Sequence, residues 1–339
     1  MTIKDIAKEA GYSVGTVSRV LNNSSGVSEK ARKRVMEVVD KYHFQLNSNA
    51  KHLKKQTQEG IAILIKDTQN MLFSAMVEQM QGLIRRKNYD SVVYYLNKED
   101  NELEEALKIC AERRPLGIIF LGMNKKKLRE RFEAVKVPCV LVTNSAADMG
   151  FDNLSSVSTD DEAAARFAVE HLLSLGHNRI GILGGSLATS QIVESRFAGC
   201  KKAFEAYHVD FDPELQYEVT DFEIAEGYRA MERLMENVAG LSAVFAMSDV
   251  LAIGAIRAIL DRGLRVPEDI SVIGFDGLDL GNYISPRLTT IRQHREEISA
   301  RCVEILLKSI DGDVPATHEI EPFHLVPGES VTIHQNRWL

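Results

Sequence analysis

Five places in the second half of the sequence put polar side chains directly after a short apolar run. They are Thr159 and Asp160, residues 184–186, Asp221 and Phe222, Ser248 and Asp249, and Asp276. If each run is a strand of one parallel sheet, these ends meet at the edge where α/β proteins collect ligands. Carboxylates accept several hydroxyl or amide hydrogen bonds, and a phenyl ring covers an apolar face. The set therefore predicts a site for a sugar, a nucleoside or a similar polar ring.

Arg196 lies near the start of the helical stretch after GILGG and offers a fork of donors to an acceptor or an anion. Simpler roles remain open for two of the acids. Asp249, with Ser248, begins a predicted helix and could cap it. Asp276 precedes Gly277 and could be a turn residue.

Strands and helices that position these residues alternate from residue 60 onward. A first set of apolar runs is GIAILI, DSVVYYL, LGIIFLG and VPCVLVT, with helices expected near 72–87, 102–113 and 127–135. A second set begins near SSVSTD and continues with RIGILGG, QYEVTD, SAVFAM and ISVIGFD, with helices near 161–175, 191–207, 223–236 and 249–262. This alternation predicts an α/β core of two doubly wound parallel-sheet subdomains. The closing part, TTIRQ, a helix at 295–310 and IEPFHLV, should cross back to complete both.

The first fifty residues carry three short helical patterns separated by tight turns. Apolar residues recur at helical spacing: Ile3, Ile6, Ala7 and Ala10 in the first pattern, Val17, Val20 and Leu21 in the second, and Val35, Val38, Val39 and Tyr42 in the third. Gly11 ends the first pattern, Ser13 begins the second, and Ser28 caps the third with Val27 as a hydrophobic staple. The pattern is that of a helix-turn-helix head around one small core.

Charge divides the chain in the same place. Residues 1–60 hold 11 Lys or Arg and six acidic residues, a net charge of +5, whereas the whole chain carries −7, so the remainder carries −12. A basic head on an acidic body suits contact with a polyanion such as DNA. A solvated basic arm is the alternative explanation.

Several other protein classes fit the sequence poorly. No apolar run is long enough to cross a membrane, and charged residues near the N-terminus replace the apolar stretch of a signal peptide, so we expect a cytoplasmic protein and not an exported sugar-binding protein. The four cysteines are far apart and show no metal-ligand spacing. GILGGSLATS lacks the GxGxxG order of a dinucleotide site, and no Ser/His/Asp set is suggested. We therefore expect no enzyme, no cofactor and no metal.

Several independent motifs occur along the chain in the order that is typical of one protein family. The head, AKHLKK, HLLSLGHNRIGILGG, SRFAGCKKAF, AMSDVLAIGAIRAILDRGLRVPEDISVIGFD and SPRLTTIRQ together resemble the lactose/galactose repressor family, LacI/GalR. The resemblance implies a transcriptional repressor with a DNA-binding head at 1–46, a hinge helix or linker at 47–58 and an effector-binding, dimerising core at 59–339. The core would be like type I periplasmic sugar-binding proteins. Its N-subdomain is expected at about 59–158 and 292–319, and its C-subdomain at about 159–291 and 320–339.

The resemblance also assigns DNA contacts. The second head helix would lie in the major groove of a palindromic operator, with Val14, Gly15 and Arg19 at base-reading positions and Arg19 suited to guanine. The residues expected at phosphates are Ser13, Thr16, Ser18 and Asn22. The hinge residues expected at DNA are Asn47, Ala50, Lys51 and Leu53, of which Leu53 would wedge between bases from the minor groove. Arg19 could instead contact a phosphate, and Leu53 could be an ordinary linker residue. The chain has Leu46 where the family usually has proline.

For the effector, the resemblance selects Leu72 and Phe73 in one subdomain and Thr159, Asp160, Arg196, Phe222, Ser248, Asp249 and Asp276 in the other. Phe73 and Phe222 would stack on a ring, although Phe73 could be a core residue. The expected effector is a small sugar-like metabolite. A purine-like ligand or a phosphoprotein partner is the alternative, and basic runs at 85–87 and 125–127 could serve the latter. No added heptad segment follows the core, which favours a homodimer over a tetramer.

Overall fold

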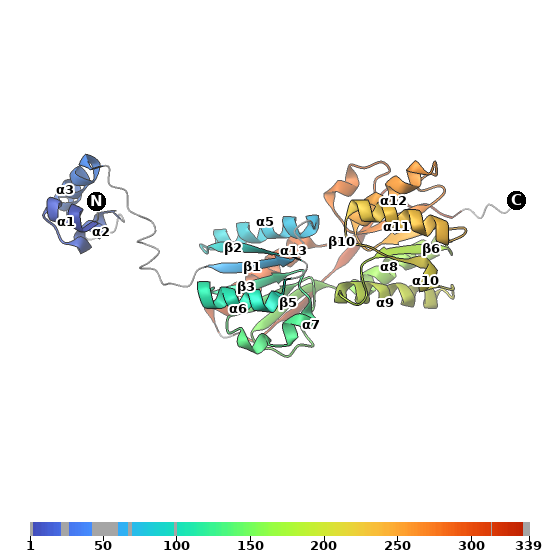
Figure 1. Ribbon diagram of the computed structural model, residues 1–339, viewed down its shortest axis with the longest axis horizontal. Helices are drawn as coiled ribbons and strands as arrows, with labels where there is room; N and C mark the ends of the chain where they lie inside the picture. The colour runs from blue at the N-terminus through green and yellow to red at the C-terminus, as the bar shows by residue number, and fades with distance from the viewer. Residues whose placement is uncertain are drawn as a thin grey trace. The chain divides into compact units, whose positions relative to one another are not determined.

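The computed structural model describes residues 3–21, 27–42, 60–66, 70–97, 100–312 and 314–334 (Figure 1). The chain divides into two compact units, Met1–Thr57 and Gln58–Leu339. In the first unit, the described helices are α1 (Ile3–Ala10), α2 (Val14–Leu21) and α3 (Glu29–Lys41). Their bounds agree with the helical spacing of the apolar residues, so the predicted helix-turn-helix arrangement is confirmed.

The three helices pack on one small core. Its buried residues are Ile6, Ala7, Ala10, Val17, Val20, Val35, Val38 and Val39, with Tyr12, Leu21 and Val27 packed against them. Gly11, at a φ of 76°, ends α1 in a conformation that favours glycine. The hydroxyl of Ser13 accepts from the backbone N–H of Thr16 (3.2 Å), and that of Ser28 accepts from Ala31 (3.3 Å).

The prediction that Tyr42 joins this core is wrong. Its side chain is 39% exposed, and its hydroxyl donates to Glu9 Oε1 (2.9 Å). Lys41 Nζ donates to the same oxygen (2.8 Å). Helical spacing places Tyr42 near the core, but a phenol at the end of a helix keeps its hydroxyl satisfied by a surface carboxylate.

The second unit contains two six-stranded sheets. The first holds β1 (Ile61–Lys66), β2 (Ser91–Leu96), β3 (Gly117–Leu121), β4 (Cys139–Val142), β5 (Leu154–Thr159) and β11 (His318–Glu321). Its order is β11-β5-β4-β3-β1-β2, and all pairs are parallel. The second holds β6 (Ile180–Gly184), β7 (Tyr217–Val219), β8 (Ala243–Ala246), β9 (Ser271–Asp276), β10 (Thr289–Gln293) and β12 (Phe323–Val326). Its order is β12-β10-β9-β8-β6-β7, and only β12 is antiparallel.

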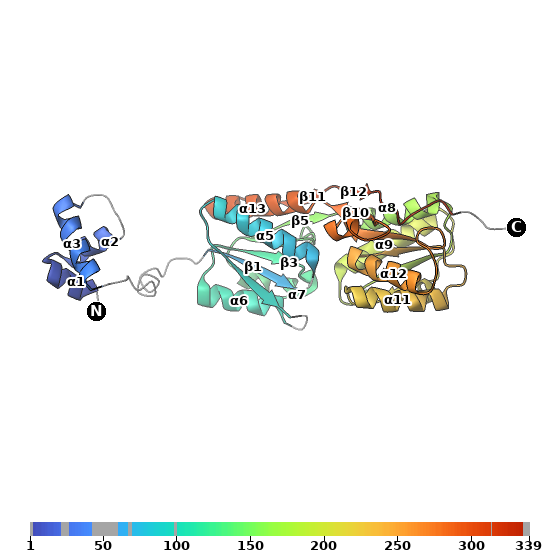
Figure 2. The same cartoon turned by 90° about the horizontal axis from the view of Figure 1, so that it is seen from above.

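Helices cover both faces of each sheet, as expected for doubly wound subdomains (Figures 1 and 2). In β1, Ile61, Ile63 and Ile65 face one apolar cluster and Ala62 and Leu64 face another. The helices of the first subdomain are α5 (Met71–Arg86), α6 (Glu102–Arg113), α7 (Lys125–Arg129), the 3-10 turn η1 (Phe132–Ala134) and α13 (Arg295–Asp311). Those of the second are α8 (Asp161–Ser174), α9 (Gln191–Ala206), α10 (Pro213–Gln216), α11 (Ile224–Asn237), α12 (Asp249–Asp261) and the 3-10 turn η2 (Asp279–Asn282).

Two details of the predicted elements are wrong. The strand that ends at Thr159 was expected to open the second set, but it pairs with β4 and β11 in the first sheet. The βα alternation is the same in both halves, so it does not reveal which neighbours a strand chooses. The helix expected at 127–135 is instead α7 followed by η1, because Arg131, at a φ of −146°, leaves helical geometry before the buried Phe132.

The chain passes between the two sheets after β5, between β10 and α13, and between β11 and β12. Figure 2 shows β10, β11 and β12 near the junction of the subdomains. The last part of the chain therefore crosses back and adds α13 and a strand to the first subdomain and a strand to the second. These connections place the carboxyl ends of both sheets beside one another.

Close helix packing in the second subdomain depends on Gly199. A Cβ there would overlap the carbonyl oxygen of Glu162 and lie 2.9 Å from the backbone nitrogen of Arg166. We expect Gly199→Ala to separate α9 from α8 and to lower the free energy of unfolding by about 1–3 kcal/mol.

Gly82, inside α5, is the matched control because nothing lies within 4 Å of its ideal Cβ. Gly82→Ala should raise the free energy of unfolding by about 0.5–1 kcal/mol through helix propensity. Thermal melts of both variants check the pair. Equal shifts of the same sign would contradict the packing argument.

Candidate functional site

One candidate site is the outer surface of α2. Val17 and Val20 are buried, whereas Val14 is 41% exposed and Gly15 and Arg19 are exposed. This is the division between core and outward-facing positions that the sequence predicts. Arg19 makes no ion pair with the described residues, in contrast to Lys41, which is paired with Glu9. The guanidinium is therefore available to an external acceptor.

Two of the residues expected at phosphates, Ser13 and Thr16, are hydrogen-bonded to each other. The hydroxyl of Ser13 lies 3.0 Å from that of Thr16 and caps α2, so both sit at the N-terminal end of the outward helix. Ser18 is half-buried on the same helix. The other residues assigned to DNA, Asn22, Asn47, Ala50, Lys51 and Leu53, lie outside the described residues, as does the predicted hinge segment.

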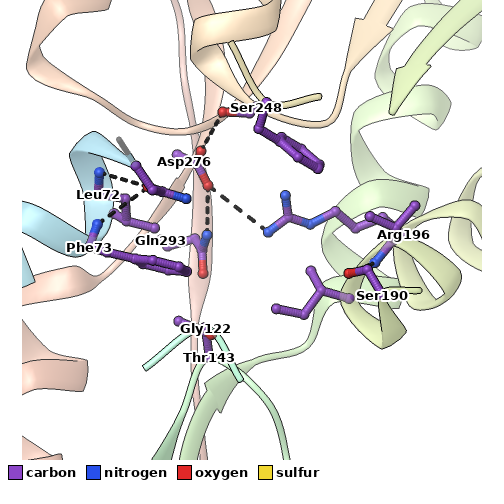
Figure 3. A pocket seen from close by; sticks show the side chains of 13 residues that line it. Leu72, Phe73, Gly122, Thr143, Ser190, Arg196, Ser248, Asp276 and Gln293 are labelled. Carbon is purple, nitrogen blue, oxygen red and sulfur yellow. Dashed lines mark hydrogen bonds and ion pairs between the residues drawn. The ribbon is translucent and has the colours of Figure 1, made fainter. Parts of the chain in front are cut away.

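A second candidate site is a cavity of about 150 Å³ between the carboxyl ends of the two sheets (Figure 3). Both subdomains line it. The first contributes Asn70, Leu72, Phe73, Gly122 and Thr143, and the second contributes Ser190, Ile192, Val193, Arg196, Phe222, Ser248, Asp276 and Gln293. Six of the residues selected from the sequence are among them: Leu72, Phe73, Arg196, Phe222, Ser248 and Asp276.

The other three selected residues lie elsewhere. Asp160 is exposed and caps α8 by accepting from Ala163 N (2.9 Å). Thr159 is buried at the end of β5 and does not line the cavity. Asp249 is fully buried and accepts from Leu278 N (2.6 Å) and Thr290 Oγ1 (2.5 Å). Its carboxylate thus connects Leu278, after the end of β9, with Thr290 in β10. It does not cap α12, the helix that it begins.

Asp276 is the polar centre of the cavity. Oδ2 accepts from Ser248 Oγ and Oδ1 accepts from Gln293 Nε2, both at 2.8 Å. Its φ of 116° is a strained value for a residue with a side chain. Gly277 follows at a φ of 73°. The end of β9 is therefore bent so that a carboxylate, 5% exposed, is held at the cavity wall.

Arg196 is less free than its sequence position suggests. Its Nε donates to Asp161 Oδ1 (2.7 Å), and Nη1 donates to the carbonyl of Met247. The guanidinium lies 3.7 Å from the centre of the Phe275 ring. Nη2 is 4.0 Å from Asp276 Oδ1 (Figure 3). Two nitrogens of the Arg196 guanidinium, Nε and Nη1, therefore hold neighbouring parts of the chain in place. Nη2 is the nitrogen directed toward Asp276.

Two glycines make room for the aromatic walls. A Cβ on Gly122, whose φ is 73°, would overlap the Phe73 ring. A Cβ on Gly185 would lie 2.8 Å from Phe222 Cε2. Phe73 also belongs to the apolar core beneath α5, so its core role and its place in the cavity wall coexist. The rings supply the flat apolar surfaces that a sugar or a base would require.

Sequence reasoning missed several wall residues. Thr143 is 5% exposed, has a φ of 74°, and its hydroxyl has no partner among the described residues. Gln293 is the last residue of β10, and Asn70 caps α5 by accepting from Leu72 N (3.0 Å) and Phe73 N (3.3 Å). The signal that could have found Thr143 and Gln293 is their position at strand ends, which was applied only to the other strands.

Three buried acids lie in or behind the cavity wall. Asp276 lines the cavity, whereas Asp161 and Asp249 are buried outside its lining, and Arg196 pairs with Asp161 and lies 4.0 Å from Asp276. Burial raises the pKa of Asp276 to about 6, even though Arg196 and the two hydrogen bonds act to lower it. Burial also raises the pKa of Asp161 and of Asp249. Hydrogen-bond donors on a ligand would stabilise the ionised carboxylates.

The raised pKa of Asp276 predicts a pH-dependent stability. Because the folded chain binds this proton more tightly than the unfolded chain, whose ordinary value is 3.8, the contribution is favourable at low pH and is lost as pH rises through about 6. At about 1.4 kcal/mol per pKa unit, the loss is on the order of 3 kcal/mol.

Asp276→Asn removes this titration. Thermal melts from about pH 4 to about pH 7.5 should show the Tm of the parent falling by several degrees relative to that of the variant. If the difference in Tm between the parent and Asp276→Asn is the same at every pH, Asp276 is already ionised at the lowest pH.

Comparisons with known proteins identify a family model for the head and another for part of the core. Residues 2–47 match the lacI family of bacterial regulatory proteins, and residues 169–331 match a periplasmic binding protein-like domain. The HTH-type transcriptional regulator MalR of Clostridium butyricum is 33% identical, with 97% of this chain and 99% of MalR covered. The transcriptional repressor PurR of Aliivibrio salmonicida is 31% identical, with 91% and 92% covered.

The solved structures add a similar result. The lac repressor dimer bound to operator and an anti-inducer superposes with a TM-score of 0.79 at 26% identity, covering 98% of this chain and 99% of that one. Among the described residues, no helix is long and apolar enough to span a membrane. Identity of this extent with MalR and PurR, over the head and the core together, shows that the chain belongs to the lacI family of bacterial regulatory proteins.

Proposed function

We propose that this chain is a homodimeric repressor that binds a palindromic operator, and that a small sugar-like metabolite in the cavity between the subdomains changes its affinity for that operator. The observation that carries the proposal is Asp276. A buried carboxylate held by Ser248 and Gln293 at a strained φ, between two aromatic walls, is arranged to receive hydroxyl groups.

The residues of α2 support the DNA-binding half of the proposal. Arg19 is exposed beside Val14 and Gly15, which carry no side-chain donors or acceptors. A guanidinium binds guanine O6 and N7 with two hydrogen bonds. Direct base reading by the described part of α2 therefore rests mainly on Arg19, with Ser13, Thr16 and Ser18 placed for phosphate contacts.

Regulation requires that the ligand favours one arrangement of the subdomains over another. The wall residues come from both sheets, and the chain connects them at β5, β10 and β11. Closure around a ligand would turn the first subdomains relative to one another across the dimer and change the spacing of the two hinge segments. The similarity to the lac repressor dimer supports a homodimer. The regulator would carry out no catalysis and would act in the cytoplasm.

The test begins with selection of a binding site from random DNA. Fluorescence anisotropy then measures affinity for the selected operator with and without sugars, nucleobases and sugar phosphates. We expect a sugar to change operator affinity by about fivefold or more, since allosteric coupling is commonly about 1–3 kcal/mol. A response only to a nucleobase would replace the sugar-like effector with a purine-like one, and no response to any compound would remove the metabolite from the proposal.

Asp276→Ala is the matched variant for this experiment. It should bind the operator with parental affinity in the absence of effector, because the head is a separate unit. The effector response should be lost, because the carboxylate between Ser248 and Gln293 is gone. A parental response in this variant would place the effector elsewhere.

The role of Arg19 is tested with Arg19→Lys and with Arg34→Ala as control. Lysine keeps the charge but loses the two-pronged hydrogen bond, so discrimination against a substituted guanine should fall by about 1–3 kcal/mol while non-specific binding persists. Arg34 lies on α3 and pairs with Glu37 (3.3 Å). Its removal should leave base discrimination unchanged. Equal discrimination by Arg19→Lys and the parent would reassign Arg19 to a phosphate.

A further inference from the structure

A second cavity of about 530 Å³ adjoins the first, which is about 150 Å³. Gly122, Ser190 and Ile192 line both. A Cβ on Gly122 would overlap the Phe73 ring and approach the Lys66 carbonyl (3.0 Å), so the packing where the two cavities meet requires glycine. Because the cavities share three lining residues, a ligand held at Asp276 can extend toward the second cavity.

The second cavity has a lining drawn from both subdomains. The first subdomain supplies Lys66, Glu102, Gly122, Met123, Asn124, Lys127 and Asn144, and the second supplies residues 188–192. Phe73 and Phe222, the aromatic walls of the first cavity, are absent from this lining. The two cavities therefore differ in chemistry: one has flat aromatic walls around a carboxylate, and the other mixes apolar surface with amide, hydroxyl, amine and carboxylate groups.

Two acceptor oxygens in this lining have no hydrogen-bond partner among the described residues. Glu102 is fully buried, and its Oε1 accepts from Lys66 Nζ (2.8 Å), but its Oε2 has no donor. Gln191 is 8% exposed, and its Oε1 is likewise without a donor. Glu102 starts α6 and Gln191 starts α9, so the unsatisfied acceptors belong to opposite subdomains. Buried acceptors left in this state are destabilising.

Two contacts join the subdomains beside the second cavity. Asn124 Nδ2 donates to the carbonyl of Thr189 (2.9 Å), and Lys126 Nζ lies 3.1 Å from Glu194 Oε1. Both contacts are exposed or half-exposed, so separating them costs little. The proposed function requires the subdomains to part and to close around a ligand. A ligand that donates to both Glu102 and Gln191 would satisfy them as the cleft closes.

The ligand group that fits is neutral and rich in hydroxyls. A phosphate dianion has no protons to donate, would leave both oxygens unsatisfied, and would lie beside the Glu102 carboxylate. An apolar group also has no protons to donate, so it would leave both oxygens unsatisfied. A hydroxyl donates to Glu102 or Gln191 and also accepts from a neighbouring cation such as Lys127, for which no ion pair with a described residue exists.

The volumes are compatible with such a ligand. A cavity needs about 10–15 Å³ on this scale to hold one water, and both cavities, at about 150 Å³ and about 530 Å³, are many times larger. We propose that the second cavity is a subsite for a second sugar ring, and that the effector is a neutral disaccharide or a glycoside of similar size. The proposal rests on the proposed function of the first cavity.

Isothermal titration of the full-length protein tests this with defined probes. They are maltose, cellobiose, lactose, sucrose, trehalose and melibiose, their constituent monosaccharides, glucose 6-phosphate and adenine. We expect at least one disaccharide to bind tenfold or more tightly than each of its monosaccharides and than glucose 6-phosphate. A monosaccharide or glucose 6-phosphate that binds as tightly as every disaccharide would overturn the second-ring subsite.

Two variants separate the subsites. Gln191→Met keeps the side-chain length but removes the acceptor, so the ratio of disaccharide to monosaccharide affinity should fall at least tenfold. Phe222→Leu alters the first cavity alone and should weaken both ligands, leaving the ratio within about threefold of the parental value. An unchanged ratio in Gln191→Met would overturn the proposal. Because Gln191→Met also removes an unsatisfied buried acceptor, its ligand-free Tm should not fall, which separates loss of the subsite from loss of the fold.

The measured affinities distinguish the second sugar subsite from the effector site itself. A monosaccharide or adenine that binds tightest and changes operator affinity leaves the effector site in place and removes only the second ring. If none of these probes binds or changes operator affinity, the sugar-responsive cavity and the second subsite fall together.

Discussion

The cleft depends on the burial of several carboxylates around one guanidinium. Asp161 holds Arg196 Nε, Asp276 lies 4.0 Å from its Nη2, and Asp249 ties the turn after β9 to Thr290. Taking these charges out of water is costly, and the raised pKa of each acid records that cost. The surrounding fold must therefore hold them in place, since nothing about an isolated strand end would keep a carboxylate buried at a φ of 116°.

Parallel-sheet topology meets this requirement. Strands β8 and β9 and the crossing strand β10 end at the same edge, so Ser248, Asp276 and Gln293 converge although they lie far apart in the sequence. The first sheet brings Thr143 and Gly122 to its own carboxyl edge, which faces the same cavity. The connections after β5, β10 and β11 carry the chain between the two sheets, and both carboxyl edges line the same cavity.

Much of this could be predicted from the sequence because it depends on local patterns. Apolar spacing located α2 and α3, and strand ends located Asp276, Ser248 and Phe222. The failures have other causes. The sheet to which β5 belongs and the burial of Asp249 against Thr290 are set by partners distant in the chain. Asp160 instead caps its own helix through Ala163, a local role that the strand-end argument did not consider. Thr143 could have been found from its position after the last residue of β4, and only its φ of 74° required the structure.

The unsatisfied acceptors give the cleft a means of coupling ligand to conformation. A ligand shifts an equilibrium only by its different affinity for the two states. In the open state, water can donate to Glu102 and Gln191 as readily as a ligand can. In the structure their oxygens are buried and have no donor among the described residues, so a bound hydroxyl is worth more there than in an opened cleft. The same difference applies to Asp276, whose buried carboxylate benefits from any added donor. In the proposed mechanism, these unpaired acceptors would make closure of the cleft depend on a ligand that brings its own protons.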